Sequence, residues 1–173
     1  MIFSPINRDG TVSGFTGSVS DVGQSAIQST VQLYSRVGWA TPWIGYLAIE
    51  ESVCVGTCAF TSAPKDSVVE IAYFTFPGYE RRGVATRMAA FLVSLAKESA
   101  ERIVVTAHTL PEENVSTAVL RKLGFVFVES REHEQDGRIW VWRHQPNQLP
   151  DPRSPSVTPP AGAGVAPSVA VDH

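Results

Sequence analysis

Residues 81–86 read Arg-Arg-Gly-Val-Ala-Thr and combine two features that favour binding of an anion. Small residues here would open a helix whose apolar positions begin at Val84. The first four N–H groups of a helix have no partner inside it, and the helix dipole places about half a positive charge there. Arg81 and Arg82 add charge beside those amides. The pattern predicts a phosphate or pyrophosphate site at the start of this helix.

The same residues also fit a less specific interpretation. A glycine between a strand and a helix is common, so an ordinary turn stays open as an alternative. Two nucleotide-binding motifs are excluded, because no Lys-Ser or Lys-Thr pair follows Gly83 and the chain has no G-x-G-x-x-G pattern. The rest of the chain must decide between a ligand site and a plain turn.

Glu70 is the acidic residue best placed to accept a proton. It lies in the run 68–76, whose β-branched and aromatic residues, ended by Pro77-Gly78, predict a strand. Side chains alternate along a strand, so Glu70 shares its face with apolar neighbours on both sides. We expect those neighbours to exclude water from its carboxylate, which favours a catalytic base. A glutamate at the sheet margin, satisfied by backbone donors, is the alternative.

The first half of the chain should supply a strand, a helix and a hairpin. We expect a short strand over residues 1–5 and a helix over residues 21–37, capped by Ser20 and stopped by Gly38. Two strand-like runs, 44–50 and 53–61, are separated by Glu51-Ser52, which predicts a tight hairpin.

The second half alternates strands and helices. Residues 102–108 predict a strand that can run parallel to the central one, because a helix crosses between them. A second helix is expected over residues 111–123, with Thr109 and Glu112 at capping-box spacing. The runs 125–134 and 138–144 should form a hairpin around Asp136-Gly137. Together the elements predict an α/β fold with a largely antiparallel sheet.

Composition limits the kinds of partner. The chain has 173 residues and a net charge of -3, which argues against nucleic acid as the main partner. No apolar stretch has the length of a signal peptide core or a membrane span, so we expect no membrane partner and a cytoplasmic location. Residues 146–173 hold seven of the 12 prolines without periodicity. We therefore predict one domain over residues 1–145 and a disordered tail.

Two cysteines, Cys54 and Cys58, should lie on one face of one strand, about 13 Å apart. A disulfide needs Cα atoms within about 7 Å, so we expect two buried free thiols. Further cysteine or histidine ligands are not nearby, and no metal site is expected.

Three segments, taken in order, resemble the GNAT superfamily of acetyl-CoA-dependent N-acetyltransferases. They read VGTCAFTSAP (55–64), VEIAYFTFPGYERRGVAT (69–86) and AHTLPEENVSTAVLRKLGF (107–125). The similarity spans roughly residues 43–142 and is closest to the bacterial branch of ribosomal-protein and N-terminal α-amino acetyltransferases. It implies a mixed, mostly antiparallel sheet flanked by helices, in which the central strand and the next one splay apart. It also implies acetyl-CoA as cosubstrate and a primary amine, on a small molecule or a peptide N-terminus, as acceptor.

The resemblance also implies which residues hold acetyl-CoA. The amides of residues 81–86 would bind the pyrophosphate, and main-chain groups on the central strand would pair with the pantetheine arm. Two residues near the second helix match positions that contact the lower arm, although helix capping would explain them equally well. The implied cofactor-binding residues are Phe74, Thr75, Phe76, Arg81, Arg82, Gly83, Val84, Ala85, Thr86, Asn114 and Ser116.

Two positions depart from the family pattern. Glu80 stands where relatives carry Gln or Arg at the start of the cofactor loop. Leu120 stands where many relatives carry a tyrosine that protonates the departing thiolate. Ser116 or water could supply that proton instead, whereas Tyr73 is a weaker candidate because it faces away from Glu70.

The acceptor amine must lose a proton before it attacks. A lysine-type amine has a pKa of about 10.4, so less than about one part in a thousand is neutral at pH 7. Glu70 is the expected base, and His108 is the second candidate, with fixing of the next loop as its alternative role. A backbone N–H near Phe74 would polarise the thioester carbonyl.

Two other functions stay open. An acyl-CoA-binding sensor without turnover would use the same fold, and an unrelated α/β protein with a nucleotide loop would prefer ATP. The acceptor is not encoded in a motif, and the oligomeric state, monomer or homodimer, is also open. An acidic, aromatic rim would suit a cationic amine or a peptide N-terminus. The residues expected to form it are Trp39, Trp43, Glu50, Glu51, Trp140 and Trp142.

Overall fold

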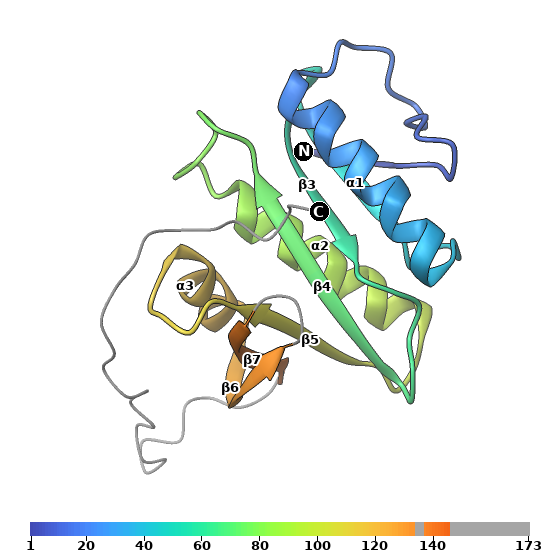
Figure 1. Cartoon of the computed structure of the whole chain (residues 1–173). Helices are drawn as coiled ribbons and strands as arrows, with labels where there is room; N and C mark the ends of the chain where they lie inside the picture. Colours follow the sequence, from blue (N-terminus) through green and yellow to red (C-terminus); the bar gives the residue numbers. More distant parts are fainter. Residues whose placement is uncertain (134–136, 146–173) are drawn as a thin grey trace.

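The computed structural model describes residues 1–133 and 137–145, whose course is shown in Figure 1. Seven strands form one sheet in the order β1-β2-β3-β4-β5-β7-β6. Strands β4 and β5 run parallel, and the other neighbouring strands are antiparallel. The expected mixed, mostly antiparallel sheet is therefore confirmed. The predicted tail and Asp136 lie outside the described residues.

The elements follow the expected order. The strands are β1 (Ile2–Pro5), β2 (Gly45–Glu50), β3 (Val53–Phe60), β4 (Val68–Thr75), β5 (Val104–Thr109), β6 (Phe125–His133) and β7 (Gly137–His144). The helices are α1 (Asp21–Val37), α2 (Val84–Ser99) and α3 (Val115–Lys122). No helix in the described part of the chain is both long enough and apolar enough to cross a membrane.

Local signals fix both ends of α1. The Ser20 side chain accepts a hydrogen bond from the N–H of Gly23, which satisfies one of the free amides at the helix start. Gly38 has φ 86, and its N–H donates to the carbonyl of Tyr34. Glycine adopts this left-handed backbone without a side-chain clash, so the helix ends there. The predicted helix is confirmed at both ends.

The β2–β3 hairpin turns at Glu51 and Ser52, as expected. Their φ values are 48 and 67, so both central residues are left-handed. This is the pattern of a type I′ turn, whose twist matches that of the two strands it joins. The turn forms although neither residue is the usual Gly or Asn.

The helices cover opposite faces of the sheet. A Cβ on Gly45 of β2 would lie 2.6 Å from Thr30 of α1, whereas a Cβ on Gly56 of β3 would meet Met88 of α2 at 3.0 Å. In Figure 1, α1 lies in front of β3 and α2 lies behind β4. Helix α3 lies on the α2 side, because the Arg121 guanidinium stacks 5.1 Å from the Trp142 ring. Trp142 pairs with Ala107 of β5, which pairs with Ile71 of β4.

The predicted start of α3 was wrong. Asn114 is the N-cap, and a capping box joins it to Thr117. Thr109 and Glu112 do not form the expected box, because Thr109 is the last residue of β5 and its hydroxyl accepts a hydrogen bond from Trp142 Nε1 at 3.0 Å. The tertiary contact with β7 therefore takes the residue that capping-box spacing assigned to a helix.

Cys54 and Cys58 are both buried and unbridged, as expected. Burial raises the pKa of both thiols. The two side chains are consequently poor nucleophiles and act as small core residues.

Candidate active site

A gap opens between β4 and β5. Their parallel ladder runs from Val68↔Val104 to Ile71↔Ala107 and stops there. Both strands continue, β4 to Thr75 and β5 to Thr109, without pairing with each other. The last four residues of β4 therefore have a partner strand on the β3 side alone. This is the splayed parallel pair that the resemblance implies.

The open edge of β4 belongs to Tyr73 and Thr75. The carbonyl of Glu70 accepts a hydrogen bond from Thr61, and the N–H of Phe76 donates to Val55, so even-numbered residues of β4 direct their main chain toward β3. Main-chain directions alternate along a strand. Tyr73 and Thr75 therefore direct their N–H and C=O groups toward the gap.

This geometry corrects the expected pantetheine contacts. Phe76 cannot offer its main chain, because its N–H donates to Val55 and its carbonyl accepts from Tyr79. Phe74 faces β3 by the same alternation, so it does not supply the N–H expected to polarise a thioester carbonyl. Of the three predicted residues, only Thr75 directs its main chain toward the gap, and Tyr73 does so as well.

Thr75 also carries an unused polar atom. Its Oγ1 is buried and has no hydrogen-bond partner among the described residues. A buried hydroxyl without a partner loses stabilisation worth about 1–3 kcal/mol. Such an atom beside an open strand edge fits a missing polar ligand, and an amide-bearing pantetheine arm would satisfy it.

The start of α2 is free to bind an anion. Gly83 is its N-cap with φ 73, and no side chain caps the helix. Arg81, the residue two before it, is also left-handed, with φ 62. The carboxylate of Glu80 turns away from the helix and accepts from the N–H of Gly78 at 2.8 Å. The amides of residues 83–86 thus keep the donors that a pyrophosphate requires.

Two exposed arginines flank these amides. Arg81 and Arg82 are both exposed, and the guanidinium of Arg82 lies 5.4 Å from the ring centre of Tyr79. Stacking on Tyr79 holds one charge near the turn, at little loss of hydration. Val84 is buried, and Ala85 and Thr86 are half-buried, which suits a backbone-lined site.

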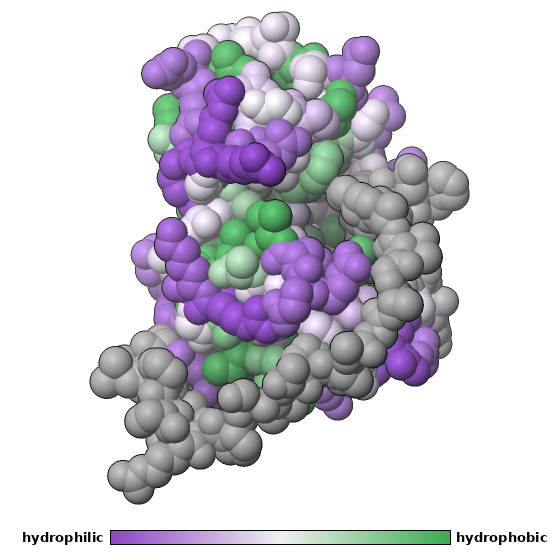
Figure 2. Space-filling model, turned by 90° about the vertical axis from the view of Figure 1, so that its left-hand side faces the viewer, coloured by the Kyte–Doolittle hydropathy of each residue, from purple (hydrophilic) through white to green (hydrophobic). Residues whose placement is uncertain are grey.

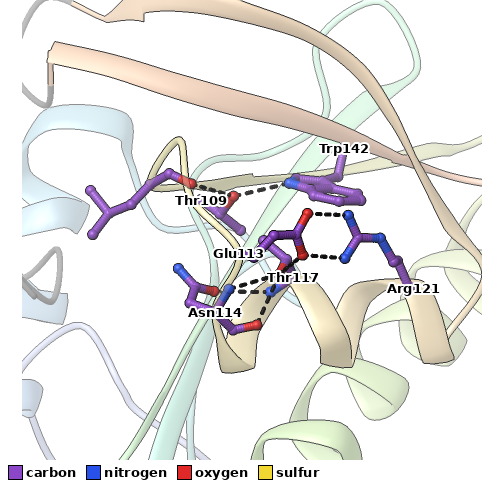
Figure 3. Close-up of polar contacts among 7 residues, drawn as sticks. Thr109, Glu113, Asn114, Thr117, Arg121 and Trp142 are labelled. Atoms are coloured by element: carbon purple, nitrogen blue, oxygen red, sulfur yellow. Dashed lines mark hydrogen bonds and ion pairs between the residues drawn. The ribbon is translucent and has the colours of Figure 1, made fainter. Parts of the chain in front are cut away.

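A second polar group marks the start of α3. Asn114 caps the helix through its side-chain oxygen, which accepts from the N–H of Thr117 at 3.1 Å. Figure 3 shows this cap beside Glu113, which holds Arg121 through two hydrogen bonds. Asn114 therefore has the capping role that was one of its two interpretations. Ser116 lies two residues after Asn114, in the first turn of α3, and is half-buried.

Glu70 and His108 form one unit. Nδ1 of His108 lies 3.1 Å from Oε1 of Glu70, and the two side chains are 18% and 30% exposed. They come from β4 and β5, on the sheet face opposite α2. The two candidate bases are thus linked by a hydrogen bond.

Arg131 of β6 completes this unit, and sequence analysis missed it. Its Nη2 lies 3.2 Å from Nε2 of His108. A guanidinium can only donate hydrogen bonds, so Nε2 must accept and Nδ1 must carry the proton. In that tautomer, Nδ1–H of His108 donates to the carboxylate of Glu70. No sequence motif marks Arg131. The sheet face on which its side chain lies depends on a bulge between Phe127 and Glu129.

The closed apolar surroundings expected for Glu70 are not found. Val68 is 39% exposed and Ala72 is also exposed, so this side of β4 is open to water. Helix α1 lies on this face and packs mainly on β3, and the Glu70 side chain stays 30% exposed. Glu70 is oriented by His108 rather than by an apolar row.

Leu120 and Tyr73 define the opposite side of the gap. Leu120 is completely buried, so it packs in the core and has no proton to give. The hydroxyl of Tyr73 donates to the carbonyl of Ser116 at 3.4 Å. Figure 2 looks onto the side that carries α3 and the β4–α2 turn, where apolar surface lies between two hydrophilic bands.

A separate hollow of about 990 Å³ borders the turn at residues 79–83, called the β4–α2 turn. It is lined by Tyr79 and Arg82 together with residues 14–17 and the β2–β3 turn. Neither Glu70 nor Tyr73 lines this hollow, so it is distinct from the site of the Glu70–His108 pair. Among the described residues no group of three His, Cys, Asp or Glu could hold a metal ion.

The amino-acid sequence of this chain matches the model of a known protein family. The model of the acetyltransferase (GNAT) domain matches residues 3–126, more than half of the chain. The chain belongs to the GNAT acetyltransferase family. The matched residues of this GNAT domain include the β4–α2 turn (residues 79–83), the open edge of β4 and the start of α3.

Solved structures share the GNAT fold. The candidate acetyltransferase yncA from Salmonella typhimurium, solved with acetyl-CoA, superposes with a TM-score of 0.55 at 16% identity over 73% of this chain and 77% of its own. The ribosomal L7/L12 α-N-protein acetyltransferase RimL, in complex with CoA, gives 0.56 at 14% identity over 73% of each chain. A candidate ribosomal-protein-serine acetyltransferase from Vibrio cholerae gives 0.57 at 16% identity, over 70% of this chain and 72% of its own. No curated protein sequence matches significantly.

Proposed function

We propose that this protein transfers the acetyl group of acetyl-CoA to a primary amine. The observation that carries the proposal is the open edge of β4, which leads from the uncapped start of α2 to the Glu70–His108 pair. A transferase needs a donor site and a proton acceptor that meet at one point. In this proposal, β4 supplies both: its open edge would hold the donor, and Glu70 on the same strand would accept the proton.

The residues present fit acetyl-CoA as the donor. Backbone amides of residues 83–86, with Arg81 and Arg82, would hold the pyrophosphate. The main chain of Tyr73 and Thr75, and the buried Thr75 hydroxyl, would hold the pantetheine arm. The solved relatives that contain acetyl-CoA or CoA support this assignment.

When bound, acetyl-CoA supplies an activated acetyl thioester. Glu70 takes the proton of the attacking amine, and His108 orients the carboxylate through Nδ1–H. The N–H groups of Tyr73 and Thr75 face the gap and are placed to polarise the acetyl carbonyl. Holding amine and thioester together in one gap supplies a further share of the rate.

The acceptor would approach the sheet face that bears Glu70. That face presents the Glu70 carboxylate, which would attract a positively charged amine before it loses its proton. Similarity to RimL, which is named for α-N-protein acetylation, supports a peptide N-terminus as one acceptor class, with small-molecule amines as the other. We keep residues 1–145 as the proposed transferase domain, with a cytoplasmic location and a monomeric or homodimeric state.

The Glu70→Gln variant tests the base. We expect turnover to fall about 10²- to 10⁴-fold, because general-base help is lost, while CoA affinity stays as in the wild type. Thiol release from acetyl-CoA over a panel of amines and peptides measures the first quantity, and calorimetry with CoA measures the second. Glu98→Gln, at an exposed position of α2, is the matched control. Unchanged turnover in Glu70→Gln would rule out this role.

A second candidate is an acyl-CoA sensor that binds without turnover. Leu120 favours it, because the usual tyrosine is missing there. Arg131 favours it too, since it occupies Nε2 of His108. A sensor would bind CoA in calorimetry and release no thiol with any amine of the panel, whereas the transferase does both.

A further inference from the structure

Tyr73 packs against the hydrophobic core at the edge of the gap between β4 and β5. It lies two residues beyond the last ladder pair of β4 and β5, Ile71↔Ala107. Its main chain faces the gap, and its side chain lies on the sheet face covered by α2 and α3. The hydroxyl reaches the carbonyl of Ser116 in the first turn of α3. The ring therefore leans from β4 toward α3, across the side of the gap opposite Glu70.

The hydrogen bond that holds the Tyr73 hydroxyl is weak. At 3.4 Å it is well beyond the usual O–H···O distance of about 2.7–2.8 Å. A neutral carbonyl is also a weaker acceptor than an anion. The hydroxyl can therefore leave Ser116 for a negatively charged atom that arrives in the gap.

We infer that the Tyr73 hydroxyl donates a hydrogen bond to the CoA thiolate as it leaves, and so replaces the tyrosine that is missing at Leu120. This inference rests on the proposed transferase function. In the step, the amine nitrogen bonds to the acetyl carbon, the carbon–sulfur bond breaks, and its electron pair stays on sulfur. The amine proton goes to Glu70, and the thiolate later takes a proton from water.

Electrostatics favour donation over full proton transfer. Burial raises the pKa of Tyr73, with a small opposing effect from its hydrogen bond to Ser116. A thiol has a pKa of about 8.5, so the proton stays on the tyrosine oxygen and the sulfur stays a thiolate. Tyr73 is thus suited to stabilise the charge on sulfur without becoming charged itself.

Ionisation of bound CoA tests this without turnover. Full-length wild type and Tyr73→Phe are saturated with CoA, and thiolate absorbance in the ultraviolet is followed against pH. A hydrogen bond to a charged group is worth about 1.5–3 kcal/mol, so the thiol of bound CoA should ionise about 10- to 100-fold more readily in wild type. The phenylalanine ring keeps the packing, so a role in packing alone would leave this ratio near one.

Turnover supplies the second readout. Hydroxylamine, a small nucleophile that is neutral at pH 7, replaces the unidentified acceptor, so the base is not required. Thiol release from acetyl-CoA should fall by about 10- to 100-fold in Tyr73→Phe, in step with the ionisation ratio. Tyr46→Phe, which removes a hydroxyl that donates to Pro42, should leave both readouts unchanged.

The outcomes separate the two levels of the argument. If wild type does not bind CoA, the proposed function fails. If wild type binds CoA and both proteins ionise it at the same pH, the transferase assignment survives and the role of Tyr73 is overturned. Calorimetry confirms that each variant is saturated, which also shows that it is folded.

Discussion

Gly83 has a backbone conformation that favours glycine, at the start of α2 where we propose that the pyrophosphate binds. Its φ of 73 lies in the left-handed region, where a side chain costs about 1–2 kcal/mol. The nearest atom to an added Cβ is Nη1 of Arg87 at 3.6 Å, so the protein itself leaves room for a methyl group. The backbone conformation favours glycine here, and the open space beside it would also let the proposed pyrophosphate approach closely.

We predict that Gly83→Ala lowers the free energy of unfolding by about 1 kcal/mol and weakens CoA binding. Gly78→Ala is the matched control, because Gly78 has φ 88 and open space around it. It should lose similar stability and keep CoA affinity. Denaturant unfolding and calorimetry measure the two quantities. Equal CoA affinity in both variants would contradict an anion site at the start of α2.

Single residues were predicted better than their contacts. Glu70 and His108 were both candidates, since alternation and strand position can be deduced locally. Their hydrogen bond depends on the β4–β5 register, and Arg131 depends on the bulge after Phe127. A bulge shifts every later side chain of β6 to the other face, and no residue type marks it.

Helix α1 is joined to the sheet by one hydroxyl. Tyr34 OH donates to the carbonyl of Ile6 at 2.9 Å and accepts from the N–H of Gly45 at 2.8 Å. All three residues are buried, so water cannot replace the hydroxyl. The contact ties α1 to the end of β1 and the start of β2.

We predict that Tyr34→Phe lowers the free energy of unfolding by about 1–3 kcal/mol, because two buried main-chain groups lose their partner. Urea unfolding measures the change. In Tyr46→Phe one half-buried bond to Pro42 is lost, and the loss of stability should be smaller. A larger loss in Tyr46→Phe would show that the Tyr34 bridge is not important for stability.

Elements with local end signals were predicted closely. Ser20 and Gly38 fixed α1, and Glu51-Ser52 fixed the β2–β3 turn, because caps and turns act within a few residues. The start of α3 was missed because Thr109 binds Trp142, a residue 33 positions away. Long-range contacts of this kind leave no spacing pattern.

The pKa of His144 depends on contacts with elements that are distant in the sequence. Its ring packs edge-on against Phe125 of β6, with 5.1 Å between the ring centres. The charge of Lys97, from α2, interacts electrostatically with the His144 ring. Burial lowers the pKa of His144, and the charge of Lys97 lowers it further. The unfolded chain therefore takes up this proton before the folded chain does.

We predict that His144 makes folding less stable in acid. With a folded pKa below 6.5, the stabilising effect of the neutral ring is present above about pH 6.5 and is lost as pH falls through the folded value. His144→Gln should weaken this dependence, and Lys97→Met should reduce it. Urea unfolding at pH 7 and pH 5 measures how much the free energy of unfolding changes between the two pH values. An equal change in wild type, His144→Gln and Lys97→Met would contradict this role of His144.

The topology was predicted from the order of elements and the family resemblance, but the division of labour between the faces was not. Helix crossover required a parallel β4–β5 pair, and the hairpins required antiparallel neighbours. Which helix covers Glu70 depends on packing, and α1 leaves that face open. The expected apolar surroundings of Glu70 were wrong for this reason.

The alternation along β4 separates the two halves of the reaction. Glu70 projects to one side of the sheet, Tyr73 projects to the other, and the amides of Tyr73 and Thr75 lie in the plane between them. In the proposed reaction, acetyl-CoA and the acceptor would therefore not compete for one entrance. Substitutions on the Glu70 face would alter the choice of acceptor without touching the proposed donor site.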